Sequence, residues 1–557
     1  MAEQDLFQLS TPAMLTSLVI FFAIMLVIST RLARRHESAD AYMVSNRRIG
    51  FGVAAASMTA TWIWAASYYG AATSAYTYGI SGAVHYGLWG ALMLLFIYPF
   101  GRRFRQLAPN AHTLAEVMWA RHGPASELAL VVSNFLGSGV SLIVNITAAG
   151  ALVSVLSPLS FFQGVAITAV GILAYTIWSG FRASVLTDFI QVSALMAVTV
   201  VIIPVIFFAA GGPSELAANM GRLTAEQANP FSMDAILNQG APFFCAVLSY
   251  AIGNQTVTQR IFSVRPDRMK ATFVTATFGY GAIVIGLGTL GFIALLVGVR
   301  PLADDPNNLL PQMASSYLPP ILVVAFAILV VASLASTADA DLAALASVVM
   351  TDVYAKNLAR GQPDAARMLF LGRVTMLVAM LVAVLIASAN LDVLTLLVIA
   401  GGLWGTIVFP VIASVYWSRV TNAAFATAVL VALLGFVVAR FEVVAVPSFG
   451  LYVLELFSII GGGVVVGLMT FAFLGRRAGI VVGAIVAIAL APFFWGFVRD
   501  YTELFAVTVA YGLSTVLCVG ITLTGRREFD LHTIQDKVTA FQVETAVEPD
   551  TITQRPT

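Results

Sequence analysis

The sequence predicts an all-α protein that crosses a membrane many times, with about fifteen transmembrane helices. Of its 557 residues, 59% are hydrophobic and only 10% are charged, whereas soluble proteins carry about 25% charged residues. Apolar runs of about 18 residues or more, the length that crosses roughly 30 Å of hydrocarbon, recur from residue 12 to residue 523. Such a chain cannot build a water-soluble surface, so its solvent is a lipid bilayer.

Fifteen apolar segments separated by polar or basic loops are the expected spans. The first follows two acidic residues, Glu3 and Asp5, and lacks both a basic segment before it and a small-residue cleavage site. We therefore expect a retained span rather than a signal peptide. The expected spans cover residues 12–30, 50–79, 82–100, 127–157, 160–179, 183–210, 241–262, 271–298, 319–350, 369–389, 392–417, 422–441, 450–475, 479–497 and 503–523.

The basic residues predict how these spans are oriented. With the N-terminus outside, 25 of the 29 lysine and arginine residues fall on the inner side. The four that remain outside are Arg222, Arg300, Arg440 and Arg499. This asymmetry follows the positive-inside rule. It predicts a multi-pass protein of the plasma membrane, a bacterial inner membrane, with its C-terminus in the cytoplasm.

Composition and motifs exclude several classes of function. The net charge is +1, so no global field attracts nucleic acid, and the expected partners are a small-molecule substrate and membrane lipid. No GxxxxGK[ST], HExxH or GxSxG motif occurs, and the polar tail after Thr524 is short. We therefore expect transport driven by an ion gradient, without enzymatic activity or an organic cofactor. Cys245 and Cys518 lie in apolar segments and are expected to be buried thiols.

The second expected span is crowded with hydroxyl and aromatic side chains, in the run SMTATWIWAASYYGAATSAYTYG that begins at Ser57. If the helix unwinds near Ala60 to Ile63, the freed carbonyls can bind a cation. Four aromatic residues would then supply the walls of a site: Trp62, Trp64, Tyr68 and Tyr69. The alternative is ordinary helix packing through small residues, with aromatic residues near the interface.

The ninth expected span contains VASLASTADADLAALASVVMTDVY. Ser333, Ser336 and Thr337 lie at positions i, i+3 and i+4, which places three hydroxyls on one helical face. Neutral oxygens suit a weakly held monovalent cation such as Na+, whereas Ca2+ prefers several carboxylates. The alternative is hydrogen bonding of these hydroxyls to their own helix. Asp339 and Asp341 follow, and an acid within a span needs a partner or water.

Polar residues also enter the sixth and seventh expected spans. Asp188 lies about a turn and a half inside the cytoplasmic end of the sixth, where it either neutralises Arg182 or forms the inner exit for a cation, which we favour. In the seventh, Pro242 and Gly253 are helix breakers, which are tolerated where backbone lines a cavity. They flank Tyr250, Asn254 and Gln255.

Three segments carry a resemblance to a known family: SNRRIGFG before the second span, NQTVTQR in the seventh, and LASTADADLAALASVVMTDVY in the ninth. Through them, from about Ala41 to Arg419, the sequence resembles the sodium:solute symporter family, which includes proline, sugar, sialate and urea carriers. It is most similar to the urea-transporter branch, which fifteen spans also fit. That similarity is carried by WIWAASYYGAATSAYTYGISG, AHTLAEVMWARHG and GGLWGTIVFPVIASVYW.

The resemblance implies a leucine-transporter-type core of two inverted five-helix repeats, with one helix before it and four after it. The implied domains are an N-terminal span and cytoplasmic loop at 1–49, the first repeat at 50–210, the second repeat at 241–417, four C-terminal spans at 422–523, and a polar cytoplasmic tail at 524–557.

The resemblance also implies which residues bind sodium. They are the carbonyls of Ala60, Ile63 and Ser333 and the hydroxyls of Ser336 and Thr337, with Asp188 at the acidic position below, where some members bind a further sodium. Tyr250 falls where sugar carriers place an aromatic inner gate. Tyr86 replaces a carboxylate and Ser67 an amide of a sugar carrier, which disfavours a polyol substrate. The expected substrate residues are Trp62, Trp64, Ser67, His85, Tyr86, Tyr250 and Asn254.

We therefore expect a sodium-coupled symporter of a small neutral polar solute, with urea favoured, working by alternating access. Sodium symport of proline, another amino acid or a short carboxylate remains an alternative, although a bound carboxylate usually needs an arginine or a helix N-terminus, and we expect no arginine in the core spans. A passive urea channel is the alternative from another class; it would need no cation site. A membrane sensor is disfavoured by the short tail.

Overall fold

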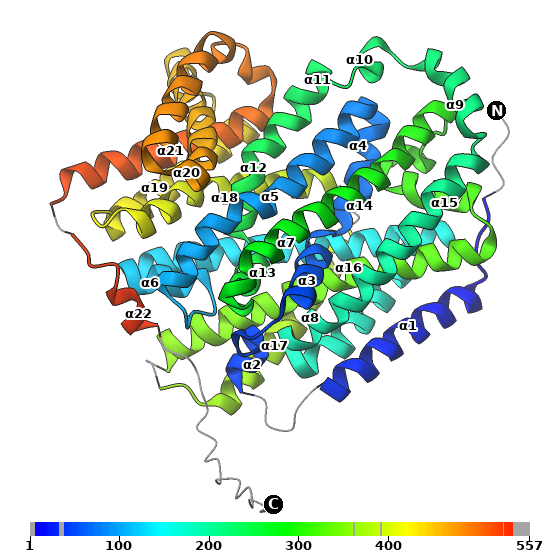
Figure 1. Cartoon of the computed structure of the whole chain (residues 1–557), viewed down its shortest axis with the longest axis horizontal. Helices are drawn as coiled ribbons and strands as arrows, with labels where there is room; N and C mark the ends of the chain where they lie inside the picture. The colour runs from blue at the N-terminus through cyan, green and yellow to red at the C-terminus, as the bar shows by residue number, and fades with distance from the viewer. Residues whose placement is uncertain (1–5, 33–37, 360–361, 390–392, 527, 539–557) are drawn as a thin grey trace, which may run out of the picture.

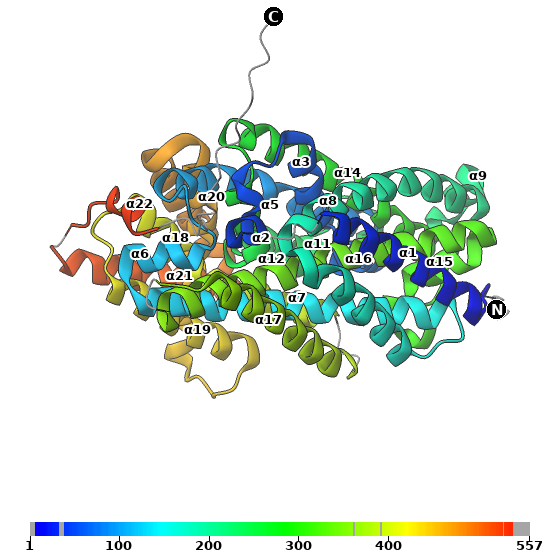
Figure 2. The same cartoon turned by 90° about the horizontal axis from the view of Figure 1, so that it is seen from below.

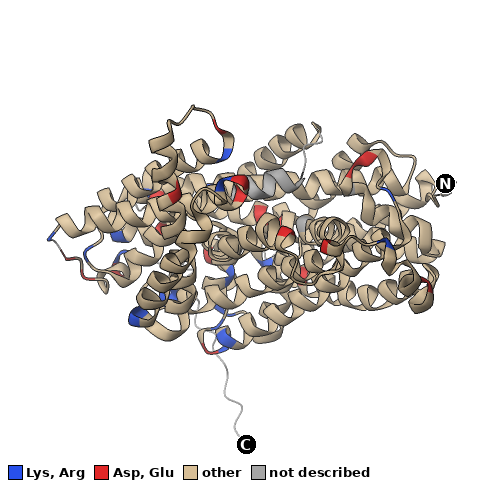
Figure 3. Cartoon of the chain, turned by 90° about the horizontal axis from the view of Figure 1, so that it is seen from above, with Lys and Arg blue, Asp and Glu red and all other residues tan. Residues whose placement is uncertain are grey.

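A computed structural model describes residues 6–32, 38–359, 362–389, 393–526 and 528–538. The described residues form helices and one isolated bridge between Ile49 and Val264, but no strands. Twelve of these helices are long and apolar enough to cross a membrane, and most of the ribbon carries no charge (Figure 3). The all-α membrane fold is thus confirmed, whereas the count of fifteen spans stays a prediction.

The N-terminal half begins with one helix outside the core and continues into the expected first repeat. The expected span 50–79 is two helices rather than one, because the chain breaks after Trp62. Helix α8 bends at Gly180, where φ is 52°, and so contains two of the expected spans. The helices are α1 (Thr11–Leu32), α2 (Ala39–Val44), α3 (Phe51–Trp62), α4 (Ala71–Tyr78), α5 (Ile80–Leu107), α6 (Leu114–His122), α7 (Pro124–Leu156) and α8 (Phe161–Ala209).

The middle of the chain contains a second broken helix. The expected span 241–262 divides at Asn254 into α12 and α13. Helix α16 continues into the π-helical segment η8 (Val349–Leu358). The helices are α9 (Gly212–Asn219), α10 (Ala225–Ala228), α11 (Met233–Ala235), α12 (Ala241–Gly253), α13 (Gln255–Ser263), α14 (Met269–Val297), α15 (Leu309–Tyr317), α16 (Pro320–Val348), α17 (Ala365–Ala387) and α18 (Val393–Tyr416).

The C-terminal helices are α19 (Asn422–Phe441), α20 (Ser448–Phe494), α21 (Thr502–Thr524) and the short α22 (Thr533–Lys537). Helix α20 bends at Gly475, where φ is 84°, and its two arms correspond to the expected spans 450–475 and 479–497. In the tail, Lys537 donates a hydrogen bond to the carbonyl of Ala120 at 3.2 Å, so α22 packs on α6. The acidic start at 1–5 and the tail at 539–557 lie outside the described residues.

Helix α16 occupies the centre of the molecule. It is rich in alanine and serine, and small side chains let helices approach closely within a membrane. Nearly every residue from Phe326 to Val348 is buried. Helices α7, α8 and α17 pack against α16, and α1 lies along α8 (Figure 1). Both views place α18 to α21 at the end of the molecule away from α1 (Figures 1 and 2). The central helix α16 and the helices packed against it position the site described below.

Candidate functional site

The first feature of the site is the break between α3 and α4. Helix α3 ends at Trp62, and Ile63 adopts a non-helical conformation with φ −89° and ψ 81°. The chain then re-enters a helix through the π-helical turn η2 (Ala66–Gly70). Breaking a helix removes the intrahelical partners of the backbone groups on either side. The break falls within the stretch from Ala60 to Ile63 where the sequence predicts unwinding.

Side chains from two other helices satisfy the freed backbone groups. Ser333 of α16 donates its hydroxyl to the Ile63 carbonyl at 2.5 Å. One turn further along α16, Thr337 donates to the Thr61 carbonyl at 3.1 Å. On the other side, the N–H of Ala65 donates to the Asn145 amide oxygen of α7 at 3.0 Å. All the side chains in these bonds are buried. The break is therefore held in place by α7 and α16.

A buried carboxylate joins this break to the second broken helix. Asp188 of α8 accepts hydrogen bonds from Ser57 of α3 at 2.6 Å and from Ser336 of α16. It also pairs with Arg260 of α13 at 2.9 Å. Arg260 in turn donates to Ser57 at 3.0 Å. The expectation that no arginine enters the core is wrong, because this guanidinium compensates Asp188; Arg182 does not.

The structure brings together all six residues expected to bind sodium. Ile63 follows Ala60 by one turn and donates its N–H to the Ala60 carbonyl at 3.2 Å. Ser333 and Thr337 of α16 donate their hydroxyls to carbonyls of this turn. Ser336, between them on α16, donates to the Asp188 carboxylate of α8. Oxygen atoms from three helices thus lie in one buried region, a donor set that suits a monovalent cation. That these residues bind sodium stays a prediction.

Sequence reasoning pointed to Asp339 as an acid that needs a partner, but it did not identify the partners. Asp339 accepts hydrogen bonds from Ser184 at 2.5 Å and from Tyr175 at 2.7 Å, both on α8. Asn145 was not singled out. Its signal was weak, because it is a single polar residue within an apolar run, and such residues in spans usually face the bundle interior.

An aromatic cavity adjoins the break. Its volume is about 20 Å³, room for one or two water molecules. Tyr250 packs edge-on against Trp64 with ring centres 6.5 Å apart, and against Trp404 at 4.9 Å. The residues that line the cavity are Trp62, Trp64, Tyr86, Gly90, Met93, Phe243, Tyr250 and Tyr280. Four expected substrate residues are therefore brought together here.

Three expected substrate residues do not line this cavity. The hydroxyl of Ser67 lies 3.1 Å from that of Tyr280, behind the wall. His85 accepts a hydrogen bond from the Trp89 indole at 3.2 Å. Asn254 caps α13. Of the lining residues that sequence reasoning missed, Tyr280 alone had a signal, as a polar aromatic residue within an apolar span.

A second polar cluster lies outside the spans, at the ends of α2 and α6. His112 is fully buried, with Nε2 2.6 Å from Asp40 and Nδ1 3.2 Å from Glu116. Burial alone would lower the pKa of His112, but its hydrogen bonds to the two carboxylates outweigh burial and raise it. Burial would raise the pKa of both acids. Instead, His112 and Arg47 lower the pKa of Asp40 to about 2. Lys356 and His112 likewise lower the pKa of Glu116 to about 2.

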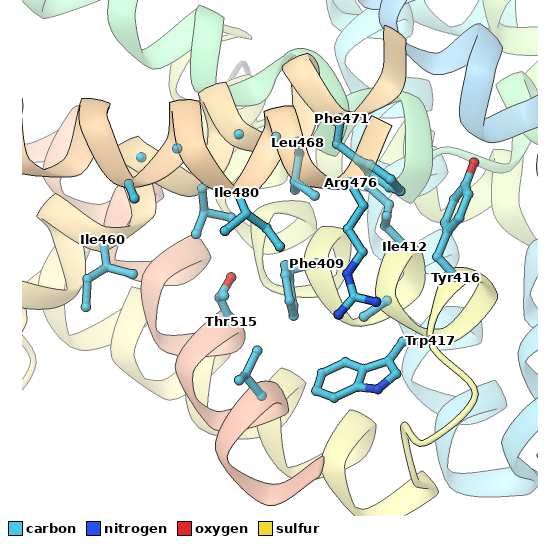
Figure 4. A pocket seen from close by; sticks show the side chains of 18 of the residues that line it. Phe409, Ile412, Tyr416, Trp417, Ile460, Leu468, Phe471, Arg476, Ile480 and Thr515 are labelled. Atoms are coloured by element: carbon cyan, nitrogen blue, oxygen red, sulfur yellow. The ribbon is translucent and has the colours of Figure 1, made fainter. Parts of the chain in front are cut away.

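The larger cavity shown in Figure 4 has a different character. It measures about 550 Å³ and lies among α18, α20 and α21. Its walls are largely apolar, with the Arg476 side chain reaching in beside Trp417 (Figure 4). A polar solute would gain few hydrogen bonds there. The smaller aromatic cavity beside the helix break is therefore the better candidate for a solute site.

Comparisons with known proteins agree with this architecture. The model of the sodium:solute symporter family matches residues 42–431. The chain is 23% identical to probable urea active transporter 1 of Schizosaccharomyces pombe over 64% of this chain and 58% of that relative. It is 24% identical to the sodium/pantothenate symporter of Escherichia coli, over 74% of this chain and 88% of the relative. It is also 24% identical to the high-affinity proline transporter PutP of Bacillus subtilis, over 72% and 86%.

One solved structure shows the fold. A sodium-coupled sialic acid symporter in a substrate-bound, outward-open state superposes with a TM-score of 0.66 at 19% identity, covering 86% of this chain and 98% of that one. This likeness confirms the leucine-transporter-type fold, while the boundaries of the two repeats stay a prediction. With a family match that extends over most of its length, this chain is a transporter rather than an enzyme and belongs to the sodium:solute symporter family.

Proposed function

We propose that the protein is a sodium-coupled symporter of urea or a closely similar neutral amide, working by alternating access. The observation that carries this proposal is the lining of the aromatic cavity. Its side chains are indoles, phenols, one phenyl ring and one thioether, with no Lys, Arg, Asp or Glu among those that line it. A charged solute would have no counter-charge in this low-dielectric site, whereas a neutral amide needs only hydrogen-bond partners.

Urea fits the chemistry of this lining. It is planar, with four N–H bonds to donate and one carbonyl to accept. Phenolic oxygens of Tyr86, Tyr250 and Tyr280 provide both kinds of partner, and the ring of Trp64 gives a flat apolar face. A cavity of about 20 Å³ also needs the least rearrangement for a solute of few atoms. Pantothenate and proline, which relatives transport, each carry a carboxylate, and Arg260 is already paired with Asp188.

We assign sodium to the oxygens at the first break: the carbonyls of Ala60, Ile63 and Ser333 and the hydroxyls of Ser336 and Thr337. Asp188 would lie below and assist cation exit. Coupling follows from the chain order, because Ile63 lies between Trp62 and Trp64, which line the cavity. A cation that fixes the Ile63 carbonyl also fixes the two indoles on either side. Binding of the cation would therefore prepare the solute site.

Uptake into proteoliposomes tests this function. We expect labelled urea to accumulate with an inward sodium gradient and not without one. Unlabelled urea should compete, thiourea or acetamide should compete more weakly, and proline, pantothenate and glucose should have no effect. Equilibration of urea independent of sodium would indicate a passive channel. Competition by proline or pantothenate, with none by urea, would reject urea but leave sodium symport intact.

One variant tests whether the aromatic cavity is the solute site. Trp64→Ala enlarges the cavity and removes a flat face, so the half-saturation concentration for urea should rise by roughly tenfold, the equivalent of about 1.4 kcal/mol. Sodium binding should remain measurable. Trp495→Ala is the matched control, because Trp495 directly follows α20, away from the cavity, and is 53% exposed. Equal effects of the two substitutions on urea affinity would place the solute elsewhere.

We also propose a bacterial inner-membrane location with the N-terminus outside and the C-terminus inside. Both native cysteines are buried, so introduced cysteines can report the topology. Ser10 and Arg477 are exposed. A membrane-impermeant maleimide added to intact cells should label Ser10→Cys but not Arg477→Cys. The reverse pattern would invert the orientation.

A further inference from the structure

Three acidic side chains are fully buried in the core around α16: Asp188, Asp339 and Asp341. The first is paired with Arg260. The second accepts two hydrogen bonds from hydroxyls of α8. Neither carboxylate oxygen of Asp341 accepts a hydrogen bond from any residue that the structure describes. Among the described residues, Asp341 is thus the one of these three acids that has no paired cation and accepts no hydrogen bond of ordinary geometry.

The groups around Asp341 are polar and incompletely bonded as well. Helix α7 carries Asn134, Ser138, Ser141 and Asn145 at spacings of four, three and four residues, which places them on one face. All four are buried. The hydroxyls of Ser138 and Ser141 lie near the Asp341 carboxylate, although neither reaches its oxygens within ordinary hydrogen-bond geometry. Within the described chain, the Ser138 hydroxyl and the Asn134 amide nitrogen also have no partner.

The fixed charges of the neighbouring described residues do not compensate the Asp341 carboxylate. The charge of Arg260 on α13 reaches Asp341, but its guanidinium is bonded to Asp188 and to the Thr256 carbonyl. The polar groups of the α7 face are neutral hydroxyls and amides. Burying an ionised carboxylate without a partner is very costly. A mobile cation bound at Asp341 would remove that cost, and the nearby serine oxygens would serve as its ligands.

The position of Asp341 connects it to the first break. It follows Thr337 by four residues, so it lies one turn further along the same face of α16, a rise of about 6 Å. The polar face of α7 ends at Asn145, whose amide oxygen accepts a hydrogen bond from the Ala65 N–H at the break. The polar groups beside Asp341 are therefore continuous with the oxygens assigned to sodium.

We propose that Asp341, with Ser138 and Ser141, forms a second site for a monovalent cation, either Na+ or H+, between α7 and α16. This site is separate from the oxygens at the first break and from Asp188. The inference rests on the proposed function in that the bound cation would be carried during transport. It does not depend on the identity of the solute.

Binding measurements on the purified full-length protein, without solute, test this site. Equilibrium binding of radioactive sodium should count one ion fewer in Asp341→Asn than in the unmodified protein if the ligand is Na+. If the ligand is H+, the sodium count should stay the same, and the infrared C=O band of a protonated carboxyl should disappear in the variant. An unchanged sodium count together with an unchanged carboxyl band would overturn the proposal.

A second pair of variants covers the possibility that Asp341→Asn does not fold. Ser138→Ala and Ser141→Ala keep the carboxylate and remove one oxygen each. In the sodium case, the double substitution should weaken binding of one ion by tenfold or more; in the proton case, it should shift the carboxyl band. If neither sodium binding nor the band changes, the proposal is overturned. A failure of urea uptake would leave these binding results unaffected, so the two proposals fail separately.

Discussion

The two helix breaks of the core are stabilised by different kinds of partner. At the first, between α3 and α4, the Ile63 carbonyl accepts from Ser333 of α16, and the Ala65 N–H donates to Asn145 of α7. At the second, between α12 and α13, Asn254 caps the following helix by itself, as its side-chain oxygen accepts the N–H two residues on at 2.9 Å. The first break depends on distant helices, whereas the second depends on a local cap.

This difference indicates which break can respond to a bound cation. A locally capped break keeps its conformation when neighbouring helices move, because its bonds move with it. The first break is held by side chains of α7 and α16, so any change in their hydrogen bonds reaches Trp62 and Trp64 directly. Coupling between two sites requires an element with two conformations, and ligand binding must shift the equilibrium between them. We therefore expect ion coupling to depend on the first break and mechanical support on the second.

The largest expected effect concerns Asp188, which joins the two broken helices. Asp188→Asn removes the charge that compensates Arg260 and weakens the contacts with Ser57 and Ser336. Breaking a buried ion pair costs about 3–5 kcal/mol, so both stability and turnover should fall. We expect turnover to drop about a hundredfold, equivalent to about 2.7 kcal/mol, with a smaller change in solute affinity. Thermal unfolding and initial rates of uptake measure the two effects.

A double substitution separates support from transport. Asp188→Asn with Arg260→Gln removes the uncompensated guanidinium and should restore much of the stability. If Asp188 acts on the cation, turnover should stay low in the double variant. Recovery of turnover together with stability would assign Asp188 to structure alone.

The next effect concerns the hydroxyls that reach the first break region. Ser336→Ala and Thr337→Ala each remove one oxygen from a buried polar site, about 1–3 kcal/mol. The sodium concentration for half-maximal uptake should therefore rise by roughly tenfold or more in each variant. Ser347→Ala is the matched control on the same helix, because among the described residues that hydroxyl bonds only to the carbonyl of Ala344. Unchanged sodium dependence in both test variants would show that the site is misplaced.

A smaller effect compares the two breaks directly. Asn145→Ala leaves the Ala65 N–H without its acceptor, and Asn254→Ala removes a helix cap worth about 1 kcal/mol. We expect similar losses of thermal stability from the two substitutions. Only Asn145→Ala should also change the half-saturation concentrations for sodium and solute. If Asn254→Ala changes them equally, the distinction between a coupled break and a supporting break is wrong.

The sequence predicts the local parts of this site better than the tertiary parts. The position of the first break and the hydroxyl face of Ser333, Ser336 and Thr337 follow from residue type and helical spacing. The pairing of Asp188 with Arg260, 72 residues away in sequence, does not, because no local pattern indicates which helices meet. The same limit applies to Asn145. The cavity residues divide in the same way. Trp64 was predicted from a segment crowded with polar and aromatic residues, whereas Phe243 lies in an apolar run and carries no signal of its own.

The smallest expected effect concerns the cluster outside the membrane that contacts the start of α13. Gln255, the first residue of α13, donates a hydrogen bond to the His112 carbonyl at 2.8 Å, so α13 lies against the segment that holds the Asp40, His112 and Glu116 cluster, while its cap stays local. The pKa of His112 is raised in the folded protein. Its contribution to stability is therefore complete below its unfolded pKa of 6.5 and is lost as the pH rises through the folded value.

The two acids have the opposite dependence. The pKa values of Asp40 and Glu116 are lowered to about 2, so their contributions are complete above their ordinary values and are lost only as the pH falls toward 2. Between about pH 5 and 6 all three groups therefore stabilise the fold. We expect the melting temperature in detergent to decline from pH 6 to pH 9, and His112→Gln to remove that decline.

His122 provides the matched control for this pH dependence. Burial lowers its pKa to about 3, with the charge of Arg121 adding to the effect. A histidine with a lowered pKa loses stability as the pH falls below 6.5 and contributes no change at higher pH. His122→Gln should therefore keep the decline between pH 7 and 9 that His112→Gln removes. If both substitutions leave the same decline, the pH dependence arises outside the cluster, and the ionisation of His112 does not stabilise the fold.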